Sequence, residues 1–332
     1  MSDVLLAREL VCIPVTSAST LRCMRPTWES LPLSVKDAVE SILGFSVVRA
    51  ESQRAGFSPG VAARVWGPAG QPAFVKAVSA EANPRSPDIH RDEARFVPLL
   101  PAGHPSPRLL GSWDDEPWVA LVFEQVEGHE PGLPWTAADL DAAVAAIDAQ
   151  ALVPAHPSLP TVWDTHADAL TGWRDLAADG TPLSDWEARH LDRLVELEAG
   201  WRSQGEGDAW LHLDARGDNM VVRPDGTAVL VDWPWSCAGA PVFDAIGFVP
   251  TAIGAGAVPG PVGPACEALL SRFASARDAS DLQVTTLVTT FAGLMAHRHR
   301  QPPMPGIPLV REFQRQQGEI ALAWLRHRTG WP

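Results

Sequence analysis

Residues Trp210–Trp235 carry the pattern that decides the fold, and they read WLHLDARGDNMVVRPDGTAVLVDWPW. Two runs of β-prone residues, Met220–Val222 and Ala228–Val231, flank the turn-forming segment Pro224-Asp225-Gly226. Apolar runs on either side of such a turn predict a β-hairpin. The segment before it, Asp214–Asn219, is polar and predicts a loop.

Three oxygen-donating side chains converge at this hairpin. Asn219 and Asp232 stand at opposite ends of the two runs, so they face each other across its open end, and Asp214 lies one loop away. Carboxylate and amide oxygens bind hard divalent cations, and a nearby carboxylate can act as a general base. Asp and Asn also occur in such loops merely as turn formers. However, the chain contains only two Asn, and one of them, Asn219, occupies the required position.

The spacing His212-x-Asp214-x-x-x-x-Asn219, with Asp232 on a following strand, is the catalytic-loop pattern described for protein kinases. This stretch resembles the kinase-like phosphotransferases, and it is most similar to the aminoglycoside phosphotransferase family. The resemblance implies that Asp214 accepts the proton of a substrate hydroxyl and that Asn219 and Asp232 hold Mg²⁺. His212 is expected to order the loop.

Three residues depart from the usual family loop. Leu213, Arg216 and Asp218 stand where a small residue, a His and a Gly are more common. Arg216 lies two residues after the expected base, where protein kinases place a phosphate-contacting Lys, so we expect it to stabilise charge on the transferring γ-phosphoryl group. Asp218 either assists the metal or caps the turn. The later segment Gly239–Asp244 resembles a family motif whose last Asp braces the catalytic loop, which implies that role for Asp244.

Lys76 is the main candidate in the N-terminal half. Only two of the 26 Lys and Arg residues are lysines, Lys36 and Lys76. A compact ammonium in the predicted strand Ala73–Val78 suits a point contact to phosphate oxygens, although a strand-edge lysine that prevents aggregation is the alternative. The family resemblance implies that Lys76 contacts the α/β-phosphates and pairs with Glu93 on a helix over 88–100. Asp92 is the alternative partner.

Two further segments are candidates for nucleotide contacts. In Phe57-Ser58-Pro59-Gly60, backbone N–H groups at Ser58 and Gly60 could meet a phosphate, although an ordinary hairpin turn has the same composition. Val122–Gly128 resembles the family's interlobe hinge, which implies adenine contacts to the Glu124 carbonyl and the Val126 N–H. The choice between ATP and GTP stays open.

The charge pattern limits the partners. A formal net charge of −14 argues against nucleic acid or an anionic membrane as a partner. Residues 130–214 hold sixteen acidic residues and four arginines, which suits a cationic substrate or simply makes a solvated acidic surface. The four cysteines lack metal-type spacing, so we expect cytosolic thiols and a cytoplasmic protein. No protein partner is inferred.

The whole pattern predicts an α+β, two-lobed, protein-kinase-like fold. We expect a peripheral extension at 1–24, a mainly antiparallel β N-lobe at 25–123, a hinge at 124–130 and a helical C-lobe at 131–332. Helices are expected from Thr136, over 163–177, after Ser184, and at 266–276, 282–299 and 308–328. The basic cluster His297-Arg298-His299-Arg300 is expected to complement a helix dipole, with metal or phosphate binding as the alternative.

The predicted function is Mg²⁺-dependent transfer of the γ-phosphoryl group of ATP or GTP to a hydroxyl of a small, aminated molecule, as in the aminoglycoside phosphotransferases. An antibiotic acceptor would make the chain a resistance enzyme. Two alternatives remain. One is a kinase of a primary metabolite such as choline or an amino-alcohol, and the other is a non-catalytic nucleotide-binding module.

Overall fold

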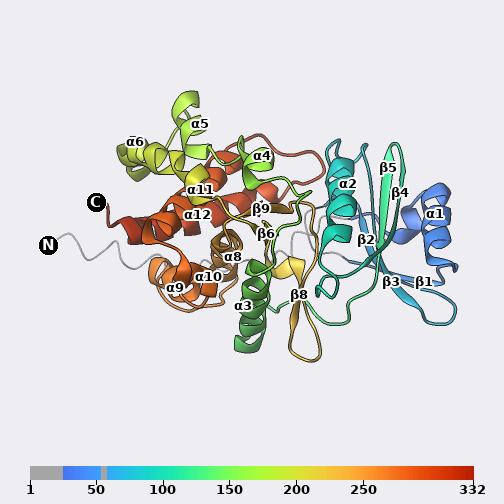
Figure 1. Cartoon of the computed structure of the whole chain (residues 1–332). Coiled ribbons are helices and arrows are strands. Elements are labelled where there is room, and N and C mark those ends of the chain that lie inside the picture. The colour runs from blue at the N-terminus through green and yellow to red at the C-terminus, as the bar shows by residue number, and fades with distance from the viewer. Residues whose placement is uncertain (1–24, 54–57) are drawn as a thin grey trace.

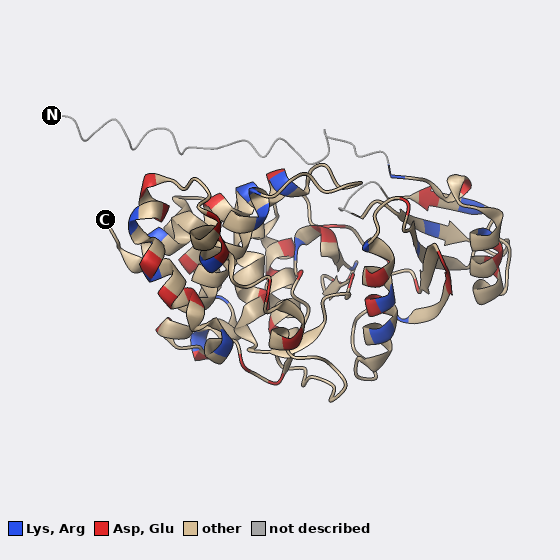
Figure 2. Cartoon of the chain, turned by 90° about the horizontal axis from the view of Figure 1, so that it is seen from above, with Lys and Arg blue, Asp and Glu red and all other residues tan. Residues whose placement is uncertain are grey.

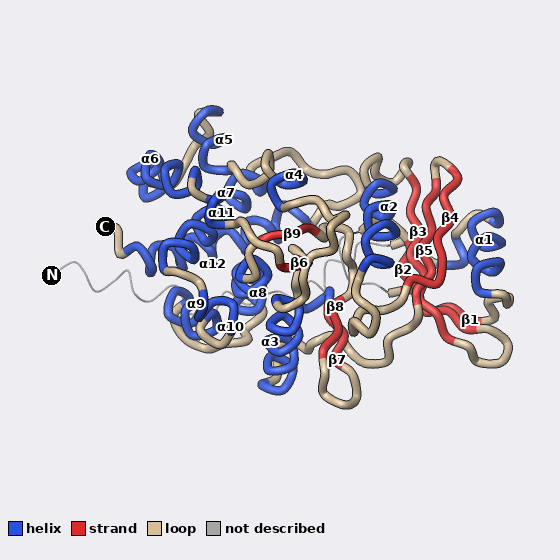
Figure 3. Tube along the Cα trace, in the orientation of Figure 1, coloured by secondary structure: helices blue, strands red, loops and turns tan. Residues whose placement is uncertain are grey.

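The structure is a computed structural model that describes residues 25–53 and 58–332, so the extension predicted at 1–24 lies outside the described residues. One five-stranded antiparallel sheet forms the N-terminal lobe, and the remaining chain is mainly helical (Figures 1 and 3). The predicted α+β, two-lobed, kinase-like architecture is confirmed. No helix among the described residues is long and apolar enough to cross a membrane.

The strand order in the sheet is β1-β2-β3-β5-β4. The strands are β1 (Arg49–Ser52), β2 (Val61–Trp66), β3 (Pro72–Ser79), β4 (Leu109–Asp115) and β5 (Trp118–Phe123). Short apolar runs in the sequence predict strands at 45–50, 61–66, 73–78, 108–113 and 118–123. The last four are present, but the first strand begins only at Arg49. One reason is that the Val47 N–H donates to the Glu40 carboxylate at 2.8 Å, which ties this segment to the preceding helix.

Side chains of β3 alternate between the two faces of the sheet, because successive residues of a strand point in opposite directions. Ala73, Val75 and Ala77 are buried with α1 (Leu33–Leu43) in one apolar cluster. Lys76 points to the other face, where α2 (Ser86–Phe96) packs on β3 and β5. The two helices therefore cover opposite faces (Figure 1). Lys76 contacts Asp232 of the C-lobe.

The C-lobe contains ten α-helices among the described residues. They are α3 (Ala137–Ala151), α4 (Val162–His166), α5 (Gly172–Asp179), α6 (Asp185–Ala199), α7 (Trp201–Gln204), α8 (Val242–Gly254), α9 (Val262–Leu270), α10 (Ala274–Asp278), α11 (Asp281–His299) and α12 (Val310–Thr329). Two helices begin where the sequence predicts: Thr136 caps α3, and Ser184 forms a capping box with Glu187 at α6.

Two helix predictions were wrong, and one helix was missed. The single helix expected over 266–276 is two helices, α9 and α10, separated at 271–273. The single helix expected over 163–177 is two short helices, α4 and α5, because Gly172 packs directly on α11: a Cβ there would lie 2.0 Å from the Gly293 carbonyl oxygen. Helix α8 was not predicted. It is buried around most of its circumference and contains Pro250, so it lacks the amphipathic period by which helices are recognised.

The central stretch folds as predicted. β7 (Met220–Val222) pairs with β8 (Ala228–Leu230) in an antiparallel hairpin, with Met220 opposite Leu230. Just before it, β6 (Ala209–Leu211) pairs with β9 (Cys237–Gly239). The loop between β6 and β7 therefore emerges between two short sheets, at the junction of the two lobes (Figure 3).

Candidate active site

The loop that carries Asp214 is fixed by a buried carboxylate. Asp244 accepts the backbone N–H of His212 at 2.8 Å and that of Leu213 at 2.7 Å. Leu213 has φ 57°, a left-handed conformation that costs a non-glycine residue energy. Burial raises the pKa of Asp244 to about 6, against the effect of the two N–H bonds. The two hydrogen bonds that Asp244 accepts hold the strained backbone of Leu213, which stands where the family usually has a small residue.

His212 connects this loop to the hairpin. Its Nδ1 accepts the Asp214 N–H at 3.2 Å, and its Nε2 lies 3.0 Å from the Val231 carbonyl. The ring packs edge-on against Trp233, with centroids 4.4 Å apart. Burial lowers the pKa of His212 to about 4, so the imidazole is neutral at pH 7 and its Nε2 carries the proton. This geometry matches the expected ordering role.

Asp214 lies between two donors. Its Oδ1 accepts from Arg216 at 2.8 Å, and its Oδ2 accepts from Asn219 Nδ2 at 2.9 Å. Burial raises the pKa of Asp214 to about 7; Arg216 opposes this rise, and Asp218 contributes to it. A carboxylate whose pKa lies near neutrality is matched to general-base chemistry.

Arg216 is held by Asp218. Its Nε and one terminal nitrogen donate to the two Asp218 oxygens, at 2.9 Å and 3.0 Å, in a bidentate pair. The guanidinium also lies 5.3 Å from the ring centroid of Phe313 on α12. Asp218, for which the sequence left two roles open, therefore positions Arg216 beside the expected base.

Lys76 connects the N-lobe to the end of the hairpin. Its ammonium lies 2.7 Å and 2.8 Å from the Glu93 oxygens and 2.8 Å from Asp232 Oδ1. Burial disfavours the ammonium, but Asp232 and Glu93 outweigh it and raise the pKa of Lys76. Burial likewise favours neutral Asp232, yet Lys76 lowers its pKa to about 2. Asp92, the alternative partner, is exposed.

Asn219 and Asp232 each leave one oxygen for a cation. Asn219 Nδ2 donates to both the backbone oxygen and Oδ2 of Asp214, so its Oδ1 is available. Asp232 uses Oδ1 for Lys76, and within the described residues Oδ2 makes no hydrogen bond. No group of three or more His, Cys, Asp or Glu forms a metal cluster in the described part of the chain. One amide oxygen and one carboxylate oxygen fit Mg²⁺, which takes its other ligands from phosphates and water.

The turn at Ser58 and Gly60, predicted to bind phosphate, has contacts within the protein that explain its residues. The Gly60 N–H donates to Ser58 Oγ at 3.3 Å, and a Cβ at Gly60 would lie 2.4 Å from the Ala77 carbonyl oxygen. Close packing on β3 therefore accounts for the glycine. The roles of Ser58 and Gly60 stay predictions, and residues 54–57 of the same turn lie outside the described ranges.

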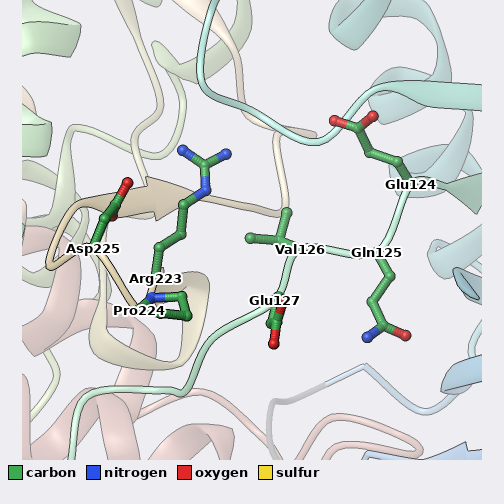
Figure 4. A pocket seen from close by; sticks show the side chains of 7 residues that line it. All are labelled: Glu124, Gln125, Val126, Glu127, Arg223, Pro224 and Asp225. Atoms are coloured by element: carbon green, nitrogen blue, oxygen red, sulfur yellow. The ribbon is translucent and has the colours of Figure 1, made fainter.

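A groove of about 510 Å³ opens beside the predicted hinge and is lined by residues 124–127 and 223–225 (Figure 4). Within the described residues, neither the Glu124 carbonyl nor the Val126 N–H makes a hydrogen bond. The Glu124 carboxylate pairs instead with Arg108 at 2.7 Å. In Figure 4, Arg223 and Gln125 extend on opposite sides of Val126. The hinge therefore offers the two main-chain groups that an adenine edge requires.

Trp233 is a site residue to which the sequence analysis gave no role. Its N–H donates to Glu93 at 3.3 Å, and its ring lies edge-on to both His212 and His104. It thereby connects the Lys76 pair to the catalytic loop. Its position directly after Asp232 in the sequence was the available signal.

The fold and this arrangement are those of a kinase-like phosphotransferase, and comparison with known proteins gives the family. A profile of the phosphotransferase enzyme family (APH) matches residues 54–280. The chain belongs to that family. No curated protein matches the sequence.

Solved structures share the fold at low identity. The aminoglycoside phosphotransferase from Alicyclobacillus acidocaldarius has 15% identity and a TM-score of 0.52, covering 90% of this chain and 96% of its own. The choline kinase LicA from Streptococcus pneumoniae has 14% identity and a TM-score of 0.58, covering 90% and 98%. Amicoumacin kinase hAmiN, solved with AMP-PNP, Ca²⁺ and Ami, has 12% identity and a TM-score of 0.54, covering 83% and 89%. At these identities the likeness concerns the fold alone.

Proposed function

We propose that this chain transfers the γ-phosphoryl group of ATP or GTP to a hydroxyl of a small molecule in a Mg²⁺-dependent reaction. The observation that carries the proposal is the convergence of four groups at the lobe junction. Asp214 has a pKa near neutrality, Asn219 and Asp232 each present a free oxygen, and Lys76 lies beside Asp232. This combination supplies a base, metal ligands and a phosphate contact in one place.

The roles follow from the positions of the groups. Asp214 accepts the proton of the acceptor hydroxyl while that oxygen bonds to the γ-phosphorus and the bond to the nucleoside diphosphate breaks. Lys76, oriented by Glu93, contacts the phosphates. When bound to Asn219 and Asp232, Mg²⁺ neutralises charge on the phosphate oxygens. The free main-chain groups of Glu124 and Val126 bind the base of the nucleotide.

Arg216 is proposed to stabilise charge on the transferring group. Its one bond to Asp214 is monodentate, whereas Asp218 holds two of its nitrogens. The nitrogen that faces Asp214 therefore lies where a phosphoryl oxygen would approach the base. Arg216→Ala is expected to lower kcat by about 10²- to 10³-fold. Arg49→Ala, at an exposed Arg–Glu pair of β1, is the control. Equal effects of the two substitutions would rule out the role.

The first experiment measures transfer of labelled γ-phosphate from ATP, and in parallel GTP, to aminoglycosides, amino-sugars and amino-alcohols. Asp214→Ala is the test variant, and Asp192→Ala, on the exposed face of α6, is the matched control. We expect a labelled product that requires Asp214. The identity of that product separates an antibiotic acceptor from an amino-alcohol such as choline, and the aminated acceptor stays a prediction until then.

Binding of Mg²⁺–nucleotide without any Asp214-dependent transfer or hydrolysis would contradict the catalytic proposal. It would instead favour a nucleotide-binding module. A cytoplasmic location is likewise part of the proposal and would be checked by fractionation of cells that express the chain.

A further inference from the structure

The hinge between the lobes is fixed at both ends. At its start, the Glu124 N–H donates to the Arg108 carbonyl at 3.0 Å, so the pairing of β4 with β5 continues one residue beyond β5. At its end, His129 exchanges two backbone hydrogen bonds with Val222 of β7, at 3.0 Å and 2.8 Å. A Cβ on Gly128 would lie 2.2 Å from the Val222 carbonyl oxygen, so the two segments are closely packed. The chain between these anchors therefore has a defined position.

Gln125 lies in this anchored segment and points to the same side of the sheet as Lys76. Side chains of an extended chain alternate between its two faces, so Gln125 follows Phe123 onto one face. The centroid of the Phe123 ring is 5.5 Å from the Lys76 ammonium, which also contacts Asp232 of the C-lobe. Figure 4 agrees with this alternation, because the Gln125 side chain extends away from that of Val126. Gln125 therefore faces the junction of the lobes.

The side chain of Gln125 has hydrogen-bonding groups that the protein does not use. Its Oε1 is buried, yet within residues 25–53 and 58–332 it accepts no hydrogen bond. Its Nε2 forms no hydrogen bond with the described residues either. An unpaired buried oxygen costs free energy, and a ligand that donates a hydrogen bond to it removes that cost.

The main-chain groups of the hinge favour adenine. The Glu124 carbonyl is an acceptor and the Val126 N–H is a donor, and neither has a partner in the described part of the chain. Adenine presents a donor at its 6-amino group and an acceptor at N1. Guanine presents the reverse, an acceptor at O6 and a donor at N1, so it would leave groups unpaired against the two fixed main-chain groups. A hinge that accepts both bases needs a group that can offer either a donor or an acceptor.

A side-chain amide that is not held by the protein is such a group. Rotation about its last side-chain bond exchanges the oxygen and the nitrogen, which have nearly the same shape. Gln150 shows the opposite case, since its Nε2 donates to the Trp210 carbonyl and its Oε1 contacts His104, so both ends are fixed. For Gln125, rotation breaks no hydrogen bond with the described residues, and the half-buried side chain leaves one edge of the amide open.

We propose that the Gln125 amide binds the purine base of the phosphoryl donor and allows the chain to use both ATP and GTP. With adenine, Oε1 accepts from the 6-amino group; with guanine, Nε2 donates to O6. Charged residues do not make this choice. Figure 2 shows Lys, Arg, Asp and Glu in both lobes, but the triphosphate on which such charges act is the same in both nucleotides. This inference rests on the proposed function and specifies its phosphoryl donor.

The test measures equilibrium binding by isothermal titration calorimetry, which needs no phosphoryl acceptor. Mg²⁺–AMP-PNP and Mg²⁺–GMP-PNP are titrated into wild type, Gln125→Leu and the control Gln283→Leu, which loses a bond to the Gln204 carbonyl at the start of α11. We expect wild type and the control to bind the two nucleotides within about tenfold of each other. Gln125→Leu should weaken GMP-PNP binding about 10- to 100-fold and AMP-PNP binding less than about fivefold, because the main chain still binds adenine.

Two further measurements distinguish a base contact from a structural role. Gln125→Glu can accept from the 6-amino group but cannot donate to O6. It should therefore keep AMP-PNP affinity within about fivefold and lose at least about tenfold for GMP-PNP. Without nucleotide, Gln125→Leu should melt at the same temperature as wild type or higher, because the substitution removes an unpaired buried oxygen. A lower melting temperature with equal losses for both nucleotides would show that Gln125 only supports the hinge.

Other results would also overturn the inference. These are unchanged affinities in Gln125→Leu, or a wild type that binds AMP-PNP more than about 100-fold tighter than GMP-PNP. A loss of affinity for 2′-deoxy-ATP or 3′-deoxy-ATP in wild type that is absent from Gln125→Leu would assign the amide to a ribose hydroxyl. In all these cases AMP-PNP binds wild type, and the proposed phosphotransferase function stands. Binding of neither nucleotide to wild type would contradict that function as well.

Discussion

Asp214 and Asp232 belong to one site, but their pKa values are shifted in opposite directions. Burial raises the pKa of Asp214 to about 7. Burial also favours the neutral form of Asp232, but Lys76 outweighs it and lowers the pKa to about 2. We predict that Asp214→Asn stabilises the folded protein at pH 8, whereas Asp232→Asn destabilises it.

The magnitude for Asp214 follows from linkage between ionisation and folding. The pKa rises from its ordinary value of 3.8 to about 7, and each pKa unit corresponds to about 1.4 kcal/mol. Between pH 3.8 and about pH 7, the folded chain keeps a proton on Asp214 that the unfolded chain has released. Stability therefore falls as pH rises through this window, by up to roughly 4 kcal/mol. Because the substitution also weakens the Arg216 contact, we expect a net gain of about 1–3 kcal/mol at pH 8.

The ionisation of Asp232 changes the folding stability in the opposite direction. A fall of its pKa from 3.8 to about 2 gives stability that is present above pH 3.8 and is lost as pH falls through the folded pKa. Its side chain is 41% exposed, so solvent screens much of this contribution. We expect Asp232→Asn to cost about 1 kcal/mol at pH 8, because Glu93 is then the one anionic partner left to Lys76 among the described residues.

Urea unfolding followed by tryptophan fluorescence measures both effects, since the chain contains 14 Trp. Wild type, Asp214→Asn and Asp232→Asn would be compared at pH 8 and pH 5 without nucleotide. The gain for Asp214→Asn should shrink by more than half at pH 5, because most of the window lies above that pH. The reasoning is refuted if Asp214→Asn is less stable than wild type at pH 8, or if its gain does not change with pH.

Three further predictions concern single groups of the site. First, kcat/KM for transfer should fall about tenfold per pH unit below pH 7, because protonated Asp214 cannot accept a proton; a profile that is flat from pH 5 to pH 8 would contradict this. Second, Lys76→Met should lower kcat/KM for ATP by about 100-fold or more, whereas Lys36→Met, which loses a bond to a backbone carbonyl, should leave it unchanged in steady-state assays. Third, Asp244→Ala leaves two N–H groups without an acceptor and should lower the melting temperature by roughly 5–10 °C, with a smaller loss for Asp244→Asn; equal losses in calorimetry would argue against these bonds.

Local patterns accounted for most of what could be predicted from the sequence. The hairpin was predictable because its turn residues and flanking strands lie within one short stretch, and its observed pairing follows from them. The rarity of lysine in this chain singled out Lys76, and the family resemblance implied its contact with Glu93, with Asp92 as the alternative. The rest of the site could be placed because the catalytic-loop spacing has a family pattern.

The features that could not be predicted from the sequence depend on tertiary packing. The break between α4 and α5 follows from the contact of Gly172 with Gly293, which lies far away in the sequence. The partner of Asp218 depends on the direction in which Arg216 leaves the loop. A basic helix end read in isolation predicts a dipole interaction, with metal or phosphate binding as the alternative.

Several features of this site destabilise the folded protein, and they are the strongest physical argument that the site is catalytic. Leu213 and Asp232 both have left-handed backbone conformations, and Asp214 is a partly buried carboxyl group, 24% exposed, whose ionisation costs stability. A neutral Asn at position 214 would keep an acceptor for Arg216 and remove that cost. The fold instead holds the strained loop with Asp244 and the ionised Asp232 with Lys76. Backbone strain, and a carboxyl group whose ionisation burial disfavours despite its two donors, are typical of groups retained for chemistry when a simple substitution would relieve them.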